Sequence, residues 1–457
     1  MPPRPEQLGR FPSSREDNPI DLRVAHQVLT SLIFLNIDEL QDVPRNPSLP
    51  QAFGNAGQKC SAASLIILVG QAYRSQRLRH QILDAASSIR VGSPSDLRSQ
   101  MGPLAEPANG KLLDGLTKLD PGQAWALEPV RIDEEGRYWS PGVRGGIKPG
   151  DPYHLTEYFG PVTGIMYAPD LATAIEYQNG TAFGLTAGLH SLDPAEIEFW
   201  VERANAGNLY VNRSITGAIV GRQPFGGWKR SAVGPGAKAG GYHYLQVLGT
   251  WRRAEASAPT PANRPCALVE QFVGHIEGLI TRDERAWLLD AVARDAHEWD
   301  EWFGRSIDIG GLENERNILR YRPAPTQVRG CADAKLVDVA RVVAAGLLAA
   351  GDDISVCLDP SLDEGLGRAL RSVGVAVTTA SDEDWYASLG AGRVRLVGGN
   401  PSRAADEVDG NPDLVVWANE VTSAPQIEFL PFLREQSVSV TAHRFGNVDA
   451  GALSVRL

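Results

Sequence analysis

The sequence has few cysteines, no long hydrophobic run and no excess of positive charge, and each absence excludes a class of protein. Its 457 residues include four cysteines, Cys60, Cys266, Cys331 and Cys357, which lie far apart and without C-x-x-C or metal-ligand spacing. This pattern argues against a disulfide framework, indicates a reducing compartment and predicts no metal site. The net charge of -11 argues against nucleic acid or an anionic membrane surface as the main partner.

Long apolar segments are also lacking. The most apolar early stretch, LTSLIFLNI from Leu29, is too short to cross a bilayer. It begins too far into the chain, and without a small-residue cleavage site, to be a secretory signal. We therefore expect no transmembrane segment and a cytoplasmic protein.

Residues 1–51 contain almost no glycine or alanine. Gly9 and Ala25 are the single examples there, beside eight prolines, whereas the other 406 residues hold 46 of the 47 glycines. We expect 1–51 to be poorly ordered, or to form a short helix around Leu22 to Leu35 with loose flanks.

From Ala52 to about Trp251, short apolar runs alternate with amphipathic segments. Strands are predicted at SLIILVG, GPVTGIMYA, TAGLHS and GNLYVN, and helices at QAYRSQRLRHQILDAASSI, DLATAIEYQN and PAEIEFWVERAN. This alternation predicts parallel βαβ units, so we assign 52–251 to one α/β domain. Residues 252–265, rich in alanine, proline and polar residues, are predicted to be a linker.

The pattern of strands and helices in residues 266–457 predicts a second α/β domain with a tail. A capping box is expected where Thr281 precedes Glu284. Strands at DISVCLD, GVAVTTA, RVRLVGG and DLVVWAN predict a small doubly wound, Rossmann-like sheet. No G-x-G-x-x-G follows DISVCLD; Asp359, Asp363 and Glu364 lie there instead, so we expect no dinucleotide in this domain. The tail, 436–446, is expected to contact 52–251 and to reach over the active-site side.

A lone cysteine lies among small residues in FGNAGQKCSAAS, directly before an apolar strand. From the residues alone, Cys60 could be a small buried hydrophobe or a nucleophile. Two more stretches bear on this choice, EYFGPV from Glu157 and QPFGGWKRSAVG from Gln223.

In this order, GNAGQKCSAAS, EYFGPV and QPFGGWKRSAVG resemble three signatures of the aldehyde dehydrogenase superfamily. VNRSITGAIVGRQPFGGWKRSAVGPGAKAGGYHYL and FLPFLREQSVSVTAHRFGN resemble, more narrowly, the L-glutamate γ-semialdehyde (Δ1-pyrroline-5-carboxylate) dehydrogenase part of bifunctional proline utilization A proteins. The resemblance implies an aldehyde dehydrogenase catalytic domain at 52–251, followed by a Rossmann-like domain. It also implies NAD as cofactor and glutamate γ-semialdehyde as substrate.

The resemblance implies a role for each site residue. Cys60 would be the nucleophile, and its own N–H would form part of an oxyanion site. Glu157 would accept hydrogen bonds from the nicotinamide ribose, with Phe159 packed beside the ring. The alternative for Glu157 is a solvated carboxylate at a strand entrance.

The same resemblance implies how the substrate's second end is held. The N–H groups of Gly217 and Ala218 would bind the α-amino carboxylate. Ser61 would add a hydroxyl, and Phe225 would pack on the aliphatic stem. The alternative is that 216–225 is a plain turn before a strand.

The sequence departs from the family pattern before Cys60. Only 59 residues precede it, and the window IDLRVAHQVLTSL has neither the glutamate nor the glycine of the family's general-base stretch. From this we expect a chain that lacks the N-terminal cofactor-binding domain: a truncated product, or a half-enzyme that assembles with a separate N-terminal chain or as a homo-oligomer. A non-catalytic remnant or interaction protein, and a dehydrogenase for another semialdehyde, are the alternatives.

Overall fold

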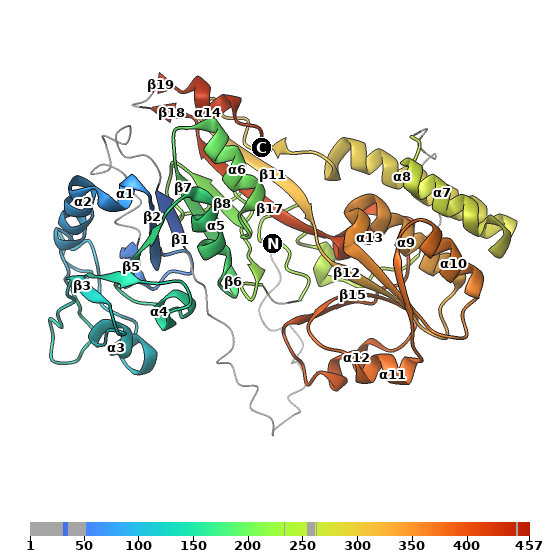
Figure 1. Ribbon diagram of the computed structural model, residues 1–457, viewed down its shortest axis with the longest axis horizontal. Coiled ribbons are helices and arrows are strands. Elements are labelled where there is room, and N and C mark those ends of the chain that lie inside the picture. Colours follow the sequence, from blue (N-terminus) through green and yellow to red (C-terminus); the bar gives the residue numbers. More distant parts are fainter. Residues whose placement is uncertain (1–30, 35–51, 233, 254–260, 262, 445–446) are drawn as a thin grey trace, which may run out of the picture.

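The computed structural model describes residues 31–34, 52–232, 234–253, 261, 263–444 and 447–457. Figure 1 shows two α/β units side by side, with two long strands, β11 (Glu315–Pro323) and β17 (Leu433–Thr441), running between them. The expected α/β class is therefore confirmed.

The first unit is built on a ten-stranded sheet of order β10-β11-β17-β8-β7-β1-β2-β5-β4-β3. Its further strands are β1 (Ser31–Phe34), β2 (Leu65–Val69), β3 (Ala124–Leu127), β4 (Gly142–Ile147), β5 (Val162–Ala168), β7 (Thr186–His190), β8 (Asn208–Val211) and β10 (Ile307–Asp308). Every neighbouring pair from β17 to β4 is parallel, whereas β3, β10 and β11 pair antiparallel with their neighbours. The central strands are buried, as a parallel sheet requires.

Helices connect these strands as βαβ units. They are α1 (Gln71–Arg74), α2 (Gln76–Ser87), α3 (Gly110–Thr117), α4 (Pro152–Leu155), α5 (Leu171–Asn179) and α6 (Pro194–Arg203). Asp170 caps α5 and Asp193 caps α6, each accepting a hydrogen bond from a backbone N–H of the first turn. Trp200 of α6 is fully buried and donates to Gln178 Oε1 of α5 at 2.8 Å, which locks the two helices together.

The single helix predicted at QAYRSQRLRHQILDAASSI is two helices. The break falls at Ser75, which has extended backbone angles and accepts a hydrogen bond from Leu78 N at 3.2 Å. A serine cap satisfies the first amide groups of α2, and this favours a new helix start over continuation of α1.

The helix considered for Leu22 to Leu35 is wrong where the structure describes that segment. Residues 31–34 form β1, which pairs in parallel with β2 on one side and β7 on the other. The apolar run Ser31–Phe34 completes the middle of the sheet, and these tertiary hydrogen bonds outweigh a local helical pattern. The remainder of 1–51 lies outside the described residues.

The second unit is a five-stranded parallel sheet of order β14-β13-β12-β15-β16. Its strands are β12 (Thr326–Gly330), β13 (Ile354–Leu358), β14 (Ala376–Thr379), β15 (Gly392–Val397) and β16 (Leu414–Trp417). Figure 1 shows α9 (Leu336–Ala350) and α10 (Glu364–Ser372) above this sheet, and α11 (Asp382–Ala387) and α12 (Pro401–Glu407) below it. When the five strands are numbered by their order in the chain, their order across the sheet is 3-2-1-4-5. This is a Rossmann-like order, so the expected Rossmann-like sheet is confirmed.

The predicted capping box is also present. Thr281 Oγ1 accepts from Glu284 N, and Glu284 Oε2 accepts from Thr281 N at 2.9 Å, at the start of α8 (Arg282–Glu298). Helix α7 (Ala267–Ile276) precedes it and packs against α9.

The first strand of this sheet was not predicted. DISVCLD is the second strand, β13, and the first is β12, whose sequence TQVRG carries a charged residue. Arg329 is fully buried in it and donates to Asp382 Oδ1 at 2.6 Å, so a pattern of apolar residues alone misses the strand. The turn that follows the first strand is therefore at 331–335. Asp359, Asp363 and Glu364 follow the second strand, so their expected placement at a pyrophosphate position is wrong. Asp333 lies in the turn at 331–335 and accepts from Gly399 N at 2.7 Å, so exclusion of a dinucleotide stays a prediction.

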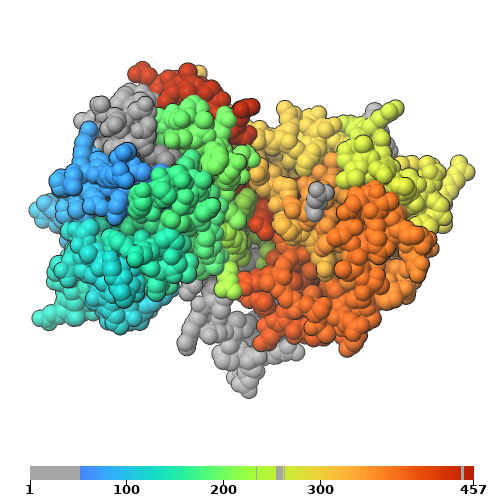
Figure 2. Space-filling model, viewed as in Figure 1, coloured from blue at the N-terminus to red at the C-terminus, as the bar shows by residue number. Residues whose placement is uncertain are grey.

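The contact expected between the tail and residues 52–251 is confirmed for 436–441. Strand β17 pairs in parallel with β8, Ser437 opposite Asn208, and Gln436 Nε2 donates to Ala206 O at 2.9 Å. The contact is made inside the sheet, because the hydrogen-bonding edge of β8 needs a partner. Figure 2 shows C-terminal residues in red against the green lobe, where Arg456 N donates to Glu198 Oε1 at 2.8 Å.

Smaller elements complete the description. They are β6 (Phe183–Gly184), β9 (Trp228–Lys229), α13 (Pro425–Glu428), β18 (His443–Arg444), β19 (Asn447–Val448) and α14 (Ala450–Ser454). No helix in the described ranges has the length and apolar character needed to cross a membrane. Most of the linker predicted at 252–265 lies outside the described residues.

Two buried histidines are expected to make the fold sensitive to acid. Burial lowers the pKa of His190 and of His243 to about 4 in each case. The unfolded chain takes up these protons near pH 6.5, so stability is lost as the pH falls from there toward 4, by about 2 kcal/mol per histidine between pH 7 and pH 5. Burial raises the pKa of Asp295 to about 6, which opposes the loss by about 1 kcal/mol.

Urea unfolding at pH 7 and pH 5 measures this effect. In His243→Phe the difference between the two pH values should shrink by about 2 kcal/mol, and the new ring should keep the stack on Phe303, whose centroid lies 5.2 Å from that of His243. Equal stability of the unmodified chain at both pH values would contradict the prediction.

Candidate active site

Cys60 lies in a tight turn between a 3-10 helix, Gly54–Gly57, and β2. Its side chain is exposed, so the buried-hydrophobe interpretation is wrong. Asn55, Ala56 and Gly57 all have positive φ, between 54° and 69°, a conformation that small residues or asparagine tolerate best. The turn therefore presents the thiol at the surface, on a backbone that bulky residues would resist.

The turn is interlocked with the EYFGPV segment. A Cβ added to Gly57 would lie 2.0 Å from the carbonyl oxygen of Gly160, so glycine alone permits this approach. Phe159, the preceding residue, also has a positive φ of 54°. Two stretches about a hundred residues apart in the chain thus meet backbone to backbone.

Glu157 is buried, with 3% of its surface exposed, so the solvated-carboxylate alternative is wrong. Together with Ala62 and Ser64 it lines a cavity of about 10 Å³, room for roughly one water molecule. A buried carboxylate is costly unless it has a dedicated partner, so burial here favours a role for this side chain.

Phe159 lines this small cavity and also a larger one of about 660 Å³. Asn55 and Gln58 of the Cys60 turn line the larger cavity too, together with Leu104 and Arg137. The cavity lies directly beside the turn that carries the thiol.

Of the remaining predicted site residues, Ser61 follows Cys60 in the chain and is buried, and the other three lie in the loop after β8. Phe225 is half-buried, and its backbone exchanges two hydrogen bonds with Ala239, at 3.0 and 2.8 Å. Gly217, at φ 79°, is exposed and Ala218 half-buried, so these two lie toward the tip of the loop.

The sheet topology places three of these segments at the end of the sheet where its parallel strands begin. Cys60 precedes β2 and Glu157 precedes its neighbour β5, so both lie at the amino ends of parallel strands. The loop carrying Phe225 returns to the same end of β8, where Asn208 Nδ2 donates to Pro224 O at 3.0 Å. Cys60, Glu157, Phe159 and the base of the 216–225 loop thus lie at the same end of the sheet, with β7 and β1 between β8 and β2.

One neighbour of the thiol was not predicted. Tyr210 of β8 is buried, and burial raises its pKa to about 12; the charge of Arg213 opposes this rise, and an electrostatic interaction with Cys60 adds a smaller contribution to it. Its stretch, NLYVN, looks like an ordinary buried strand, so the sequence carries no signal for this proximity.

Residues 42–250 match the family model described as Aldehyde dehydrogenase family. They form an aldehyde dehydrogenase family domain. The match begins before Ala52, so the change in composition there does not mark its start. The three quoted motifs all lie inside the matched residues.

Two relatives are both named 1-pyrroline-5-carboxylate dehydrogenase. The 1-pyrroline-5-carboxylate dehydrogenase of Geobacillus sp. (strain WCH70) is 36% identical over 195 residues, which are 42% of this chain and 37% of that protein. The Bacillus subtilis (strain 168) protein is 32% identical over 214 residues, 47% of this chain and 41% of its own length. The chain thus spans well under half the length of these relatives.

A solved structure is similar beyond the aldehyde dehydrogenase domain. Proline Utilization A (PutA) from Corynebacterium freiburgense has a TM-score of 0.75 and 36% identity, covering 93% of this chain and 39% of that one. The likeness therefore extends over both α/β units.

The 216–225 loop of the aldehyde dehydrogenase domain is tied to strands of the C-terminal part. Gln223 is buried; its Oε1 accepts from Ile219 N at 2.8 Å, and its Nε2 donates to Glu315 Oε1 at 2.8 Å and to Asn317 Oδ1 at 2.5 Å. Arg213 forms an ion pair with Glu315 at 2.8 Å. The amide of one glutamine thus joins the loop to β11.

Replacement of Gln223 by alanine should loosen this loop, because it removes the hydrogen bonds to Glu315 and Asn317 of β11 and leaves the Ile219 amide without its acceptor. We expect a loss of about 1–3 kcal/mol in stability, and faster trypsin cleavage after Arg222, followed by mass spectrometry. Gln76→Ala, at an exposed position of α2, is the control and should change neither. Unchanged cleavage after Arg222 in the Gln223 variant would contradict the tether.

Proposed function

We propose that the aldehyde dehydrogenase domain acts in the oxidation of L-glutamate γ-semialdehyde to glutamate, with Cys60 as nucleophile. The observation that carries the proposal is an exposed thiol on a strained, small-residue turn, interlocked through Gly57 and Gly160 with a buried carboxylate, Glu157. The relatives named 1-pyrroline-5-carboxylate dehydrogenase support this substrate class.

The chemistry requires the thiolate to add to the aldehyde carbon, forming a C–S bond and a tetrahedral thiohemiacetal whose oxygen the Cys60 N–H would stabilise. Loss of hydride from that carbon gives a thioester, and water then releases the carboxylate and regenerates the thiol. The exposed position of Cys60 would let the substrate reach the sulfur. Tyr210, buried beside the thiol, would wall the site.

Glu157 and Phe159 are proposed to hold the nicotinamide end of NAD. The carboxylate of Glu157 would accept from ribose hydroxyls once the cavity of about 10 Å³ beside it opens, and Phe159 faces a further cavity of about 660 Å³ beside the Cys60 turn. NAD, when bound, would supply the hydride acceptor. An exposed thiol suits a reducing cytoplasm, and assembly with further chains stays a prediction.

The loop from Gly217 to Phe225 is proposed to select the substrate. The backbone N–H groups of exposed Gly217 and half-buried Ala218 would suit an α-amino carboxylate, and half-buried Phe225 would suit an aliphatic stem. Ser61, buried next to Cys60, would add a hydroxyl.

Competition for the thiol tests the proposal without relying on turnover. The chain is treated briefly with iodoacetamide, with and without glutamate γ-semialdehyde, and each cysteine is quantified by mass spectrometry. We expect Cys60 to react fastest and to be protected by the semialdehyde, whereas Cys266, also exposed, is not protected.

Propionaldehyde, which lacks the α-amino carboxylate, should protect Cys60 less. Equal protection by succinic semialdehyde would favour the alternative of another semialdehyde. Labelling led by another cysteine, with no protection of Cys60, would leave a non-catalytic remnant as the better interpretation.

A further inference from the structure

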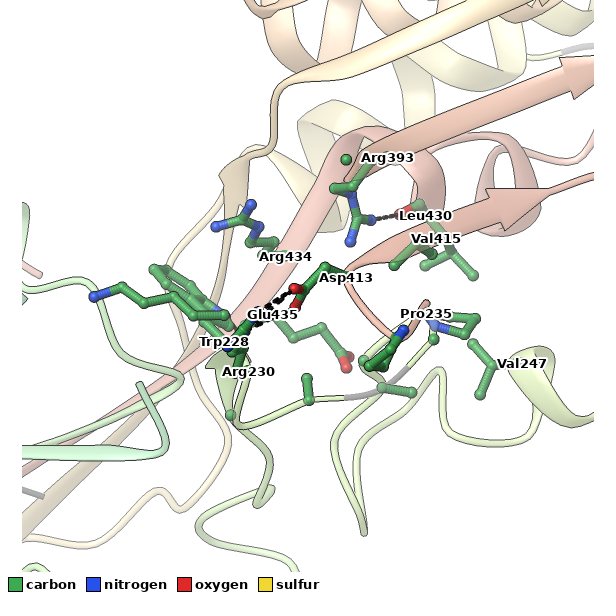
Figure 3. Close-up of a pocket in the computed structure, with 18 of the residues that line it drawn as sticks. Trp228, Arg230, Pro235, Val247, Arg393, Asp413, Val415, Leu430, Arg434 and Glu435 are labelled. Atoms are coloured by element: carbon green, nitrogen blue, oxygen red, sulfur yellow. Dashed lines mark hydrogen bonds and ion pairs between the residues drawn. The ribbon is translucent and has the colours of Figure 1, made fainter. Parts of the chain in front are cut away.

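A cavity of about 460 Å³ lies between the two α/β units, away from Cys60. Its walls come from the segment around β9 in the aldehyde dehydrogenase domain, from the starts of β15 and β16, and from residues 430–435 leading into β17. Figure 3 shows these walls converging, with Trp228 and Arg230 on one side and Val415 and Leu430 on the other.

Positive side chains predominate in this cavity. Lys229, Arg230, Arg393 and Arg434 line it, and two carboxylates, Asp413 and Glu435, lie among them. Each carboxylate is engaged on its own side. Asp413 pairs with Arg230, with Nη2 and Oδ2 2.5 Å apart, and Glu435 accepts from the backbone N–H of Lys238 at 3.1 Å.

Two guanidinium groups keep unused donors. Arg393 donates through Nε and Nη2 to the carbonyl groups of Leu430, Pro431 and Leu433, which leaves Nη1 without a hydrogen bond to any described residue. Arg434 makes no hydrogen bond within the described ranges; its guanidinium lies 5.8 Å from the centroid of the Trp228 ring. A guanidinium carries five donors, so both groups have donors available for an anion that enters the cavity.

The cations also repel one another. Burial lowers the pKa of Arg393 to about 10, and the charge of Arg434 adds to this effect. Burial likewise lowers the pKa of Lys229 to about 8, again with Arg434 contributing. Such repulsion is relieved by an anion that accepts hydrogen bonds from more than one cation.

The remaining wall is apolar. Val247, Val415, Trp417, Leu430 and Leu433 contribute to it. A ligand suited to both surfaces carries one anionic group and an apolar body, and the volume is that of a small-molecule site.

We propose that this cavity binds a small organic carboxylate, held by Arg434 and Arg393. Its apolar part packs against Val415 and Leu430, beside the ring of Trp228. Because the walls come from both units, the ligand favours the arrangement in which they are closed on each other. The site is separate from Cys60, so the proposal does not depend on the function proposed above.

Titration calorimetry and thermal melting with benzoate test it on the full chain. Benzoate should bind saturably in the millimolar range and raise Tm. Benzamide, its uncharged counterpart, should bind at least about tenfold more weakly. Sodium phosphate at matched ionic strength should not reproduce the shift, because it has no apolar part.

Arg434→Gln should weaken benzoate binding by about tenfold or more, whereas Arg368→Gln, at an exposed position of α10, is the control and should not change it. If Arg434→Gln does not fold, the proposal is tested by Arg393→Gln, which should also weaken benzoate binding, and by the comparison of benzoate with benzamide. Absence of saturable benzoate binding, equal binding of benzamide, or full binding by a folded Arg434 variant would each overturn the proposal. Phosphate binding of equal strength would overturn the commitment to an organic carboxylate.

Discussion

Cys60→Ser is expected to abolish acylation of this chain by p-nitrophenyl acetate, lowering the rate by about a thousandfold or more. In the reaction the thiolate attacks the ester carbon, a thioester forms and p-nitrophenolate leaves, so the yellow product reports the step directly. A serine hydroxyl ionises far less readily than a thiol, so a serine at the exposed position of Cys60 is a much weaker nucleophile. The measurement is the initial burst of absorbance, compared with the amount of chain.

Cys266→Ser is the matched control, because Cys266 is also exposed but lies at the start of α7, away from the aldehyde dehydrogenase motifs. Its burst should equal that of the unmodified chain. Cys331 and Cys357 are buried, and burial raises the pKa of Cys331 to about 12, so neither should contribute. A burst that survives in Cys60→Ser but is lost in Cys266→Ser would refute the assignment of the nucleophile.

Gly57→Ala is expected to destabilise the chain by about 2–4 kcal/mol and to disorganise the Cys60 turn. The added Cβ would lie 2.0 Å from the Gly160 carbonyl oxygen, and the φ of 69° is unfavourable for alanine. Relief of the clash must separate the Cys60 turn from the segment that carries Glu157 and Phe159. Urea unfolding measures the loss, and the rate of iodoacetamide labelling at Cys60 reports the turn.

Gly54→Ala separates the clash from the general effect of replacing a glycine. Gly54 lies in the same 3-10 helix, but a Cβ there meets no atom within 4 Å. This variant should keep its stability to within about 0.5 kcal/mol. If both variants behaved alike, the backbone contact with Gly160 would not be what holds the site together.

The local pattern was sufficient for the elements whose burial is purely apolar. LIILV and VTGIMYA became β2 and β5, and the box of Thr281 and Glu284 started α8, because each depends on neighbours in the chain. It failed where a buried charge replaces a hydrophobe. Arg329 in β12 is neutralised by Asp382, a partner that no local window contains.

The same division applies to the candidate site. Small residues around Cys60 already indicated a position where a thiol can be approached, and the motif order indicated its companions. Whether Cys60 was exposed and Glu157 buried depended on how separate segments pack, and both were settled by the fold. The residues around Tyr210 gave no indication of its proximity to Cys60, because that proximity arises only when β8 packs in the sheet.

The sequence by itself determined which chemical groups and elements are present. These are a lone thiol among small residues, a carboxylate before a strand, and two sets of α/β elements. Only the tertiary structure decided which of these meet. Gly57 touches Gly160, Gln223 reaches β11, and β17 completes the edge of β8, because backbone hydrogen-bonding groups and close-packed surfaces must find partners wherever the chain supplies them. Those partners lie up to some hundreds of residues away, beyond the reach of any periodic pattern.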